Sequence, residues 1–218
     1  MKRAKLFFDE YASDFDSIYG QNRTLPQKII DTFFRKSMRL RFEKSLEFCK
    51  PLEGRTILDI GCGPGHYCLA LAEQGARKVV GIDFSEDMIE IAKKRASSMG
   101  LLERCEFLVQ DFFEFSSSDR FDYIVIMGVM DYIENAESFI TKVGALSPKK
   151  VCFSFPADGG ILSLQRKIRY RKRCPLYMYT FKEIERILCK LFDGGYNIEK
   201  IERDFFVSID FERSIQIF

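Results

Sequence analysis

The sequence predicts an α/β fold in which a mostly parallel β-sheet is covered by helices on both faces. From Thr56 onward, short apolar runs alternate with segments of helical periodicity. The apolar runs are nearly continuous, as expected for parallel strands that are buried on both faces. The last two runs, within residues 197–211, follow each other without a helix between them. They predict an antiparallel pair at the edge of the sheet.

Two helices are predicted before the first strand. Near the start of the chain, aromatic residues recur at every fourth position and form one stripe: Phe7, Tyr11, Phe15 and Tyr19. A second helix is expected to begin at Thr24 as its N-cap, with Pro26 in the first turn, and to end at or just before Pro51. We therefore predict an N-terminal helical cap of residues 1–50, followed by a domain of residues 51–218.

The middle of the chain predicts five strands and the helices that connect them. The strands are expected at residues 56–60, 78–84, 105–112, 121–129 and 149–155. The helices are expected at residues 66–74, 85–99 (with Ser85 as N-cap) and 137–146. After Pro156 the alternation stops, because an insertion of residues 157–179 precedes a helix at 180–192 and the two final strands.

The composition argues against several kinds of site. The chain has 34 basic and 32 acidic residues and a net charge of +2, which gives no overall attraction for nucleic acid. Its 7 cysteines are odd in number and form no CxxC pair, so we expect reduced thiols rather than a disulfide framework. With His66 as the single histidine, no zinc or iron site is expected.

The sequence gives no sign of a secretory signal or a membrane span. The opening MKRAKLFFDEYASDF has a basic start, but Asp9 and Glu10 interrupt any apolar region. The longest apolar run, YIVIMGVM, is far too short to cross a bilayer. We therefore expect a soluble, cytoplasmic protein.

The stretch TILDIGCGPGH, residues 56–66, places three glycines directly after a predicted strand. Such a turn lets a ligand approach the backbone closely, and dinucleotides and S-adenosylmethionine both use a strand, a glycine-rich turn and a helix. The spacing here is GxGxG, at Gly61, Gly63 and Gly65, whereas the dinucleotide fingerprint GxGxxG would need a glycine where His66 stands. Asp59 would repel a pyrophosphate but suits a ligand that carries an ammonium and a sulfonium.

Acidic residues also end the next two strands. Asp83 lies twenty residues beyond Gly63, where a carboxylate can accept both ribose hydroxyls of either ligand. Asp111 and Phe112 end the third strand, where an acid can accept from an adenine amino group and an aromatic ring can pack on the base. Together, the glycine turn and these acids predict a nucleoside site at the carboxyl ends of successive strands.

The motifs ILDIGCGPG, VVGIDFS, FLVQDF and FDYIVIMGVMDYI resemble those of the class I S-adenosylmethionine-dependent methyltransferases, over roughly residues 50–155. The resemblance implies a Rossmann-like, seven-stranded sheet with helices on both faces. It implies that the glycine turn packs on the methionine part of the cofactor, and that Met127 and Gly128 lie beneath it near the methyl group. The cofactor-binding residues that we predict on this basis are Asp59, Gly61, Cys62, Gly63, Gly65, Asp83, Phe84, Met88, Asp111, Phe112, Met127 and Tyr11.

Three residues are candidates for catalysis. His66, beside the glycine turn, could act as a base or hydrogen-bond the cofactor's carboxylate, or it could simply start a helix. Asp131 follows the fourth strand, where this fold presents residues to the substrate. It could steer or deprotonate the acceptor, or be an ordinary turn acid. Tyr19 enters through a second resemblance, described below.

The insertion contains a strongly basic run, RKIRYRKR at residues 166–173, with no acid. Charge runs are often solvated helix faces, but this one follows the fifth strand, where related enzymes place a substrate lid. It would favour an acceptor with carboxylates or phosphates, or an anionic membrane surface. The candidate substrate residues are Arg166, Lys167, Arg169, Arg171, Lys172 and Arg173.

The stretches LFFDEYASDFDSIYG and VCFSFPADGGILSLQRKIRYRKRCPLY are similar to parts of the magnesium-protoporphyrin O-methyltransferases, which esterify a porphyrin carboxylate. In that group a tyrosine of the N-terminal arm and a histidine after the fourth strand are associated with catalysis. The matching positions here are Tyr19 and Asp131. An aspartate at neutral pH cannot donate a hydrogen bond as histidine does, which argues against the porphyrin as substrate.

The predicted function is therefore S-adenosylmethionine-dependent O-methylation of a small anionic metabolite or a lipid-linked acceptor. Porphyrin carboxylate methylation is one alternative. RNA methylation is another, suggested by the basic run, although GVMD stands where an NPPY-like tetrapeptide would be expected and the net charge is nearly neutral. A cofactor-binding protein without turnover and a nicotinamide dehydrogenase remain as further alternatives, and the glycine spacing argues against the dehydrogenase.

Overall fold

The computed structural model describes residues 25–160, 163–164, 168 and 175–214. The predicted first helix, Thr24 and the basic run of residues 166–173, apart from Ile168, lie outside these residues. The helices are α2 (Leu25–Phe48), α3 (His66–Glu73), α4 (Glu86–Ser98), the 3-10 turn η2 (Met130–Tyr132), α5 (Ala136–Ala145) and α7 (Phe181–Leu191). The strands are β1 (Thr56–Ile60), β2 (Lys78–Asp83), β3 (Cys105–Val109), β4 (Tyr123–Ile126), β5 (Lys150–Pro156), β6 (Tyr196–Ile201) and β7 (Asp204–Asp210).

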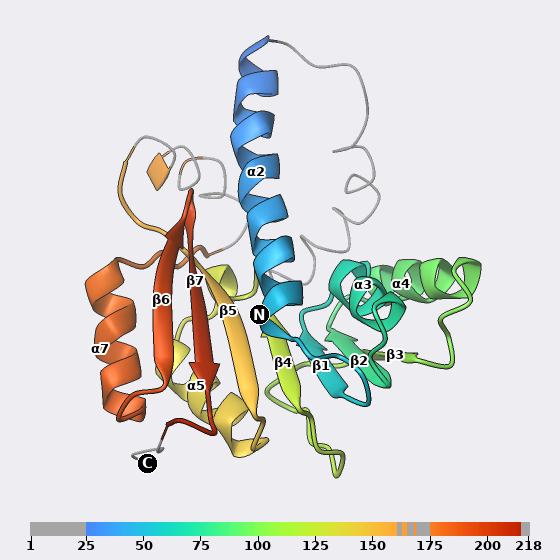
Figure 1. Ribbon diagram of the computed structural model, residues 1–218. Coiled ribbons are helices and arrows are strands. Elements are labelled where there is room, and N and C mark those ends of the chain that lie inside the picture. Colours follow the sequence, from blue (N-terminus) through green and yellow to red (C-terminus); the bar gives the residue numbers. More distant parts are fainter. Residues whose placement is uncertain (1–24, 161–162, 165–167, 169–174, 215–218) are drawn as a thin grey trace.

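The strands form one seven-stranded sheet in the order β3-β2-β1-β4-β5-β7-β6 (Figure 1). Strands β1 to β5 are parallel, and β7 pairs antiparallel with both β5 and β6. The predicted α/β class, the mostly parallel sheet and the antiparallel pair near its edge are thus confirmed. The strand order reverses between β1 and β4, and ligands of such sheets bind at this point, beyond the carboxyl ends of the strands.

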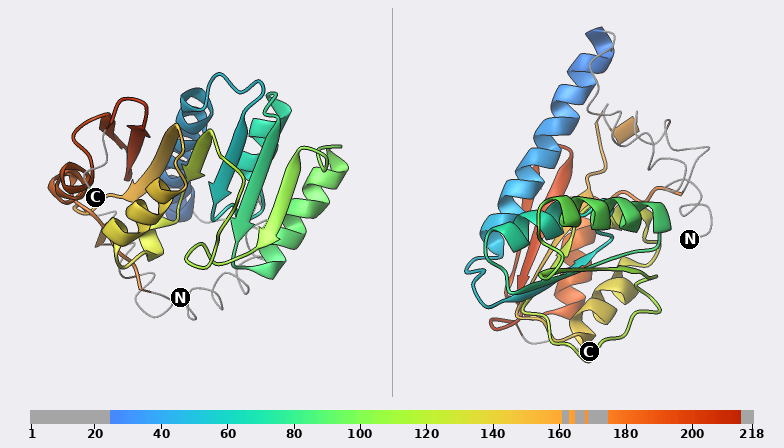
Figure 2. Two further views of the ribbon diagram at one scale, coloured as in Figure 1. Left: turned by 90° about the horizontal axis from the view of Figure 1, so that it is seen from below. Right: turned by 90° about the vertical axis from the view of Figure 1, so that its right-hand side faces the viewer.

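Helices cover both faces of the sheet (Figure 2). One apolar core lies between the sheet and α5 and α7, and includes Phe139, Phe153 and Leu188. A second core lies on the other face, where α3 and α4 pack, and includes Leu71 and Ala92. This two-layer burial explains why the central strands are apolar on both sides.

Two strands are shorter than the sequence predicts by more than one residue. β3 ends at Val109 rather than at residue 112, and β4 covers Tyr123–Ile126 rather than residues 121–129. The end of β4 has a physical cause, because Gly128 adopts a φ of +77° and the chain then turns into η2. The sequence reading extended this strand through an apolar run that the backbone leaves early.

Helix α2 crosses the sheet and contacts β5, β6 and β7, while its first half projects past the sheet edge (Figure 1). Near its end it packs on α3, where the rings of Phe42 and Tyr67 lie 5.3 Å apart. Lys44 also donates to Glu199 of β6 at 2.8 Å. The described part of the predicted N-terminal cap is therefore joined closely to the rest of the fold.

Helix α7 begins with a capping box, and this predicts a measurable loss of stability. The Thr180 side chain accepts from the Glu183 backbone N–H, and the Glu183 carboxylate accepts in return from the Thr180 backbone at 2.7 Å. We expect Thr180→Ala to lower the free energy of unfolding by about 1 kcal/mol, because it removes the side-chain acceptor of the Glu183 N–H at the start of the helix. Urea unfolding measures the change, with exposed Lys182→Ala as the control. Equal midpoints for Thr180→Ala and the wild type would contradict it.

Within the described ranges, no helix is both long enough and apolar enough to cross a membrane. The same ranges contain no group of three or more histidine, cysteine or acidic side chains arranged to hold a metal ion.

Candidate cofactor and acceptor site

The glycine turn connects β1 to α3 at the carboxyl edge of the sheet. Gly61, Gly63 and Gly65 have φ values of +71°, +50° and +82°, in the left-handed region that favours glycine. The backbone N–H groups of Gly61 and Cys62 both donate to the Ile82 carbonyl, at 2.8 and 3.0 Å. The turn is therefore fixed to the end of the neighbouring strand β2.

The Asp83 carboxylate holds the same turn from the side. One of its oxygens accepts from the Gly63 N–H at 2.9 Å, and the other accepts from the Ser85 N–H at 2.9 Å. A carboxylate can accept more than two hydrogen bonds, so this brace is compatible with a ribose contact. The sequence suggested Asp83 for the ribose alone, whereas the structure also gives it the role of fixing the turn.

The three glycines are needed for different reasons. A Cβ at Gly61 would collide with the side chain of Val129, and one at Gly65 would lie 3.0 Å from Ala92 Cβ. A Cβ at Gly63 would meet no described atom within 4 Å. Gly61 and Gly65 thus allow close packing within the protein, while Gly63 borders open space. An open, bare backbone at this turn fits a nucleoside ligand that lies against the main chain.

Asp59 lies in β1 and is buried, with 1% of its surface exposed. One carboxylate oxygen accepts from the Cys68 thiol at 3.3 Å. Burial raises the pKa of Asp59 to about 7, against the opposing effect of the thiol hydrogen bond, and the Asp83 charge raises it further. Asp59 therefore lies beneath the site rather than in open contact with it, a setting that its position at the strand end did not predict.

This raised pKa predicts a pH-dependent stability. In the unfolded chain Asp59 titrates near 3.8, and in the folded chain near 7, so between these values the folded state keeps a proton that the unfolded state has lost. The Asp59 contribution to the free energy of unfolding is therefore present at low pH and lost as the pH rises through about 7. We expect Asp59→Asn to gain stability relative to wild type over this window. The free energy of unfolding of both proteins is measured between pH 4 and about 7. A difference between Asp59→Asn and wild type that does not change with pH over this range would contradict the prediction.

The adenine side of the site differs from the simplest expectation. Asp111 follows β3, and one of its oxygens accepts from the Phe113 N–H at 2.9 Å. Phe112 is only 7% exposed, and its ring packs in the core 4.8 Å from that of Phe139. Phe113 is 39% exposed and is the aromatic side chain that borders solvent here. The sequence predicts Phe112 because it directly follows the acid, but most of its ring is buried in the core.

The remaining predicted cofactor residues lie around the same turn. Ser85 caps α4 by accepting from the Met88 N–H, as predicted, and Met88 itself is 2% exposed. Phe84 is half-buried at the end of β2, and Cys62 is buried within the turn. Met127 is buried at the end of β4. The structure thus brings Asp83, the glycine turn and the end of β4 together at one edge.

His66 begins α3 beside the turn. Its Nε2 lies 3.2 Å from Nη1 of Arg95, which also donates to the Pro64 carbonyl at 3.4 Å. Because arginine can only donate, the Nε2 atom is the acceptor in this contact and the imidazole is neutral. In this arrangement Nε2 faces a cation of the protein itself.

Asp131 lies in η2 and is 2% exposed. Its backbone carbonyl accepts from the Tyr177 N–H at 2.8 Å, and the Tyr179 hydroxyl donates to the Ile133 carbonyl at 3.1 Å. Burial and the nearby Asp131 carboxylate raise the pKa of Tyr179 to about 12, so this phenol stays protonated at neutral pH. The turn after β4 is thereby joined to the segment that follows the insertion.

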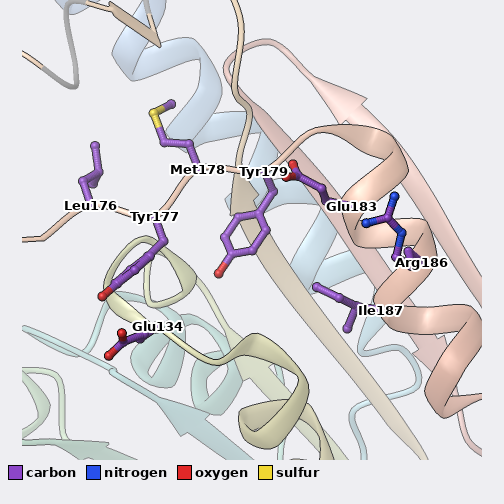
Figure 3. Close-up of a pocket in the computed structure, with 8 residues that line it drawn as sticks. All are labelled: Glu134, Leu176, Tyr177, Met178, Tyr179, Glu183, Arg186 and Ile187. Carbon is purple, nitrogen blue, oxygen red and sulfur yellow. The ribbon is translucent and has the colours of Figure 1, made fainter.

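A pocket of about 450 Å³ lies beside this junction, between the turn after β4, residues 176–179 and α7 (Figure 3). Its lining combines aromatic, apolar and charged side chains: Glu134, Leu176, Tyr177, Met178, Tyr179, Glu183, Arg186 and Ile187. The lining contains two glutamates and one arginine, so its charge does not favour an anion. Its location makes it a candidate for the less polar part of an acceptor.

Several predicted site residues lie outside the described residues. They are Tyr11, Tyr19, Arg166, Lys167, Arg169, Arg171, Lys172 and Arg173. Conversely, the sequence reading overlooked Arg41 of α2 and Ser154 of β5, which lie next to Gly128. A signal was present, since Ser37, Arg41 and Ser45 recur every fourth residue on a helix face that had to pack on the sheet.

The comparisons with known proteins agree with this geometry. A family model described as a methyltransferase domain matches residues 52–168, more than half of the 218-residue chain. The chain is 33% identical over 116 residues to a ubiquinone biosynthesis O-methyltransferase of Mesorhizobium japonicum, over 53% of this chain and 45% of that protein. A protein of the same description from Rhizobium leguminosarum bv. trifolii is 27% identical over 200 residues, or 90% of this chain and 73% of that protein.

For the first three curated relatives, the matched part covers 45%, 63% and 43% of their length, so the chain spans about half of the proteins it matches first. Among solved structures, magnesium protoporphyrin IX methyltransferase from Synechocystis PCC 6803, with bound S-adenosylhomocysteine (SAH), has a similar fold. The TM-score is 0.74 at 21% identity, over 94% of this chain and 96% of that chain. The chain therefore belongs to the methyltransferase-domain family and has the predicted fold of the S-adenosylmethionine-dependent methyltransferases.

Proposed function

We propose that this protein transfers the methyl group of S-adenosylmethionine to an oxygen atom of a small anionic or lipid-linked acceptor. The observation that carries the proposal is the glycine turn, which is braced by Asp83 and open at Gly63, at the point where the strand order reverses. The cofactor supplies an electrophilic methyl group on a sulfonium. The protein's task is then to hold an acceptor oxygen in line with that methyl, and positioning alone can lower the barrier by ~7 kcal/mol or more.

In this proposal the glycine turn faces the methionine part of the cofactor, and Asp83 adds a ribose contact to its brace. Asp111 and the neighbouring Phe113 would border the adenine. Asp59 is buried beneath the turn. A cationic ligand bound above it would favour the ionised carboxylate, because an opposite charge stabilises that form. His66 would contribute as a hydrogen-bonding group beside the turn rather than as a general base, because Arg95 already occupies its Nε2.

The acceptor assignment rests on the relatives and on position. The matched curated proteins are described as O-methyltransferases of ubiquinone biosynthesis, and the compared structure is a porphyrin methyltransferase. The Asp131 carboxylate is buried, which argues against a role as the base that deprotonates the acceptor. Asp131 would instead position Tyr177 through its backbone carbonyl. Tyr19 and the six basic residues of 166–173 are retained as proposed contacts to the acceptor, or to an anionic membrane surface.

A direct experiment tests the reaction class. The purified chain is incubated with methyl-labelled S-adenosylmethionine and three acceptors, namely 3,4-dihydroxybenzoate, magnesium protoporphyrin IX and total RNA, and the products are identified by mass spectrometry. A labelled methoxy or methyl ester product that Asp83→Ala fails to form would support the proposal. Label only in RNA would favour the RNA alternative, and binding of the cofactor without any labelled product from these acceptors or from cell extract would favour a binding protein.

A second candidate, methyl esterification of a porphyrin carboxylate, is favoured by the fold similarity over nearly the whole chain. It predicts labelled ester in the porphyrin arm and none in the dihydroxybenzoate arm.

A further inference from the structure

The pocket between the turn after β4, residues 176–179 and α7 has two tyrosine rings in its wall (Figure 3). The rings of Tyr177 and Tyr179 point to the same side of their segment, toward the turn that carries Glu134, whereas Leu176 and Met178 point to the other side. The volume of about 450 Å³ lies in the range of small-molecule sites. The pocket can therefore hold a small ligand against aromatic faces.

The main chain holds these two tyrosines in place. The Tyr177 N–H donates to the Asp131 carbonyl at 2.8 Å, and the Tyr179 N–H donates to the Pro156 carbonyl at 2.9 Å. Asp131 lies in η2, just after β4, and Pro156 is the last residue of β5. The aromatic wall is thus fixed to the ends of two central strands, so little conformational entropy is lost when a ligand enters.

The charges around the pocket are unevenly distributed. On α7, hydrogen bonds from Thr180 lower the pKa of Glu183, and the Arg186 charge lowers it further, so the glutamate and the arginine offset each other. Glu134 lies across the pocket from α7 (Figure 3). Among the residues that the structure describes, its carboxylate makes no hydrogen bond or ion pair. The wall after η2 therefore carries an uncompensated negative charge.

The tyrosine rings add to the preference for a cation. The Tyr179 hydroxyl donates to the Ile133 carbonyl at 3.1 Å, and its phenol is protonated at neutral pH. The faces of neutral tyrosine rings carry partial negative charge, which attracts ammonium groups. Aromatic faces beside an uncompensated carboxylate favour an organic cation over a neutral or anionic molecule of the same shape.

We propose that this pocket binds the ammonium group of a small aromatic amine. The ammonium lies between Glu134 and the tyrosine rings, and the apolar body of the ligand contacts Ile187, which points into the pocket from α7 (Figure 3). The ammonium has two possible sources, namely a substituent of the methyl acceptor and a separate small molecule. The inference goes beyond the proposed function, because this binding requires no cofactor.

Three probes that share a 4-hydroxyphenyl body test the charge preference. At neutral pH tyramine is a cation, 4-ethylphenol is neutral and 3-(4-hydroxyphenyl)propanoate is an anion. NMR titration in the absence of cofactor gives the dissociation constants. We expect the wild-type chain to bind tyramine roughly 10-fold more tightly than 4-ethylphenol, and to bind the propanoate most weakly. Equal affinities for the three probes, or a preference for the anion, would overturn the inference.

Two variants with the same charge change test the role of Glu134. Glu134→Gln should reduce the preference for tyramine over 4-ethylphenol to roughly 3-fold and leave the affinity for 4-ethylphenol unchanged. Glu185→Gln is the matched control, because Glu185 is an exposed acid of α7 that does not line the pocket. It should keep the wild-type preference. Equal losses in the two variants would mean that the overall charge, rather than the pocket, attracts the cation.

A third variant tests the location. Ile187→Trp should weaken the binding of all three probes, because the larger side chain fills the pocket. Undiminished tyramine binding to this variant would place the probe elsewhere and overturn the inference.

Incubation of tyramine with methyl-labelled S-adenosylmethionine distinguishes the two sources of the ammonium. O-methylated tyramine that Glu134→Gln forms more slowly than Glu185→Gln would identify the ammonium as part of the acceptor. Tyramine that binds but gains no label would identify a separate ligand. The titrations require no methyl transfer, so a failure of the proposed function would leave their result standing.

Discussion

Asp83→Ala is expected to weaken S-adenosylhomocysteine binding by roughly 100-fold or more, because hydrogen bonds to a charged carboxylate contribute about 1.5–3 kcal/mol each. The change removes the acceptor of the Gly63 and Ser85 N–H groups, so the turn loses its brace at the same time as the proposed ribose contact is lost. We expect the fold to persist, since β2 and its pairs with β1 and β3 remain. Calorimetry gives the affinity, and circular dichroism checks the fold.

The matched control for Asp83→Ala is Glu90→Ala. Glu90 is an exposed acid of α4 that pairs with Lys94, and it removes one negative charge without touching the turn. Its effect on affinity should be small. Should Asp83→Ala bind the ligand as tightly as Glu90→Ala does, neither the brace nor the ribose contact would matter for binding.

Gly63→Ala is expected to lower cofactor affinity roughly 10-fold or more, since an added methyl that overpacks a close contact costs about 1–3 kcal/mol. No described protein atom lies within 4 Å of that methyl, so the collision would be with the ligand. The φ of +50° adds a folding cost of about 1–2 kcal/mol for a residue with a Cβ.

Gly100→Ala separates the two effects of Gly63→Ala. Gly100 lies just after α4, has a φ of +69° and also has no described atom within 4 Å of its would-be Cβ. It should therefore show a similar loss of stability in urea unfolding and no loss of affinity. Equal affinity losses in the two variants would mean that backbone strain, rather than ligand contact, explains the result at Gly63.

The sequence was most informative where local patterns are sufficient. The apolar runs predicted each strand of the parallel sheet because both of its faces are buried, and Ser85 predicted the start of α4 because an N-cap acts on the next three residues. The glycine turn was predicted because its backbone conformation excludes most side chains. These features depend on neighbours in the chain.

Features that depend on distant partners were not predictable in the same way. Arg41 contacts Ser154 and Gly128, which lie far along the chain. The spacing of Ser37, Arg41 and Ser45 indicates which face of the helix packs on the sheet, but it does not identify these partners. The burial of Asp59 and of the Phe112 ring likewise depends on what packs against them. Spacing between residues predicted the sheet edge at which we propose that the ligand binds, but only the packed structure shows which atoms there remain open.

The hydrogen bond from Ser37 to Asp204 joins residues separated by 167 positions, and Asp204 begins β7, which lies between β5 and β6. During synthesis α2 emerges early. It cannot form its contact with Asp204 until β7, the last strand of the chain, has been made and has inserted between β5 and β6. The glycine turn and its Asp83 brace, by contrast, need only the first two strands. Nascent chains that stop before β7 should therefore form the glycine turn and its Asp83 brace before α2 reaches its final position on the sheet.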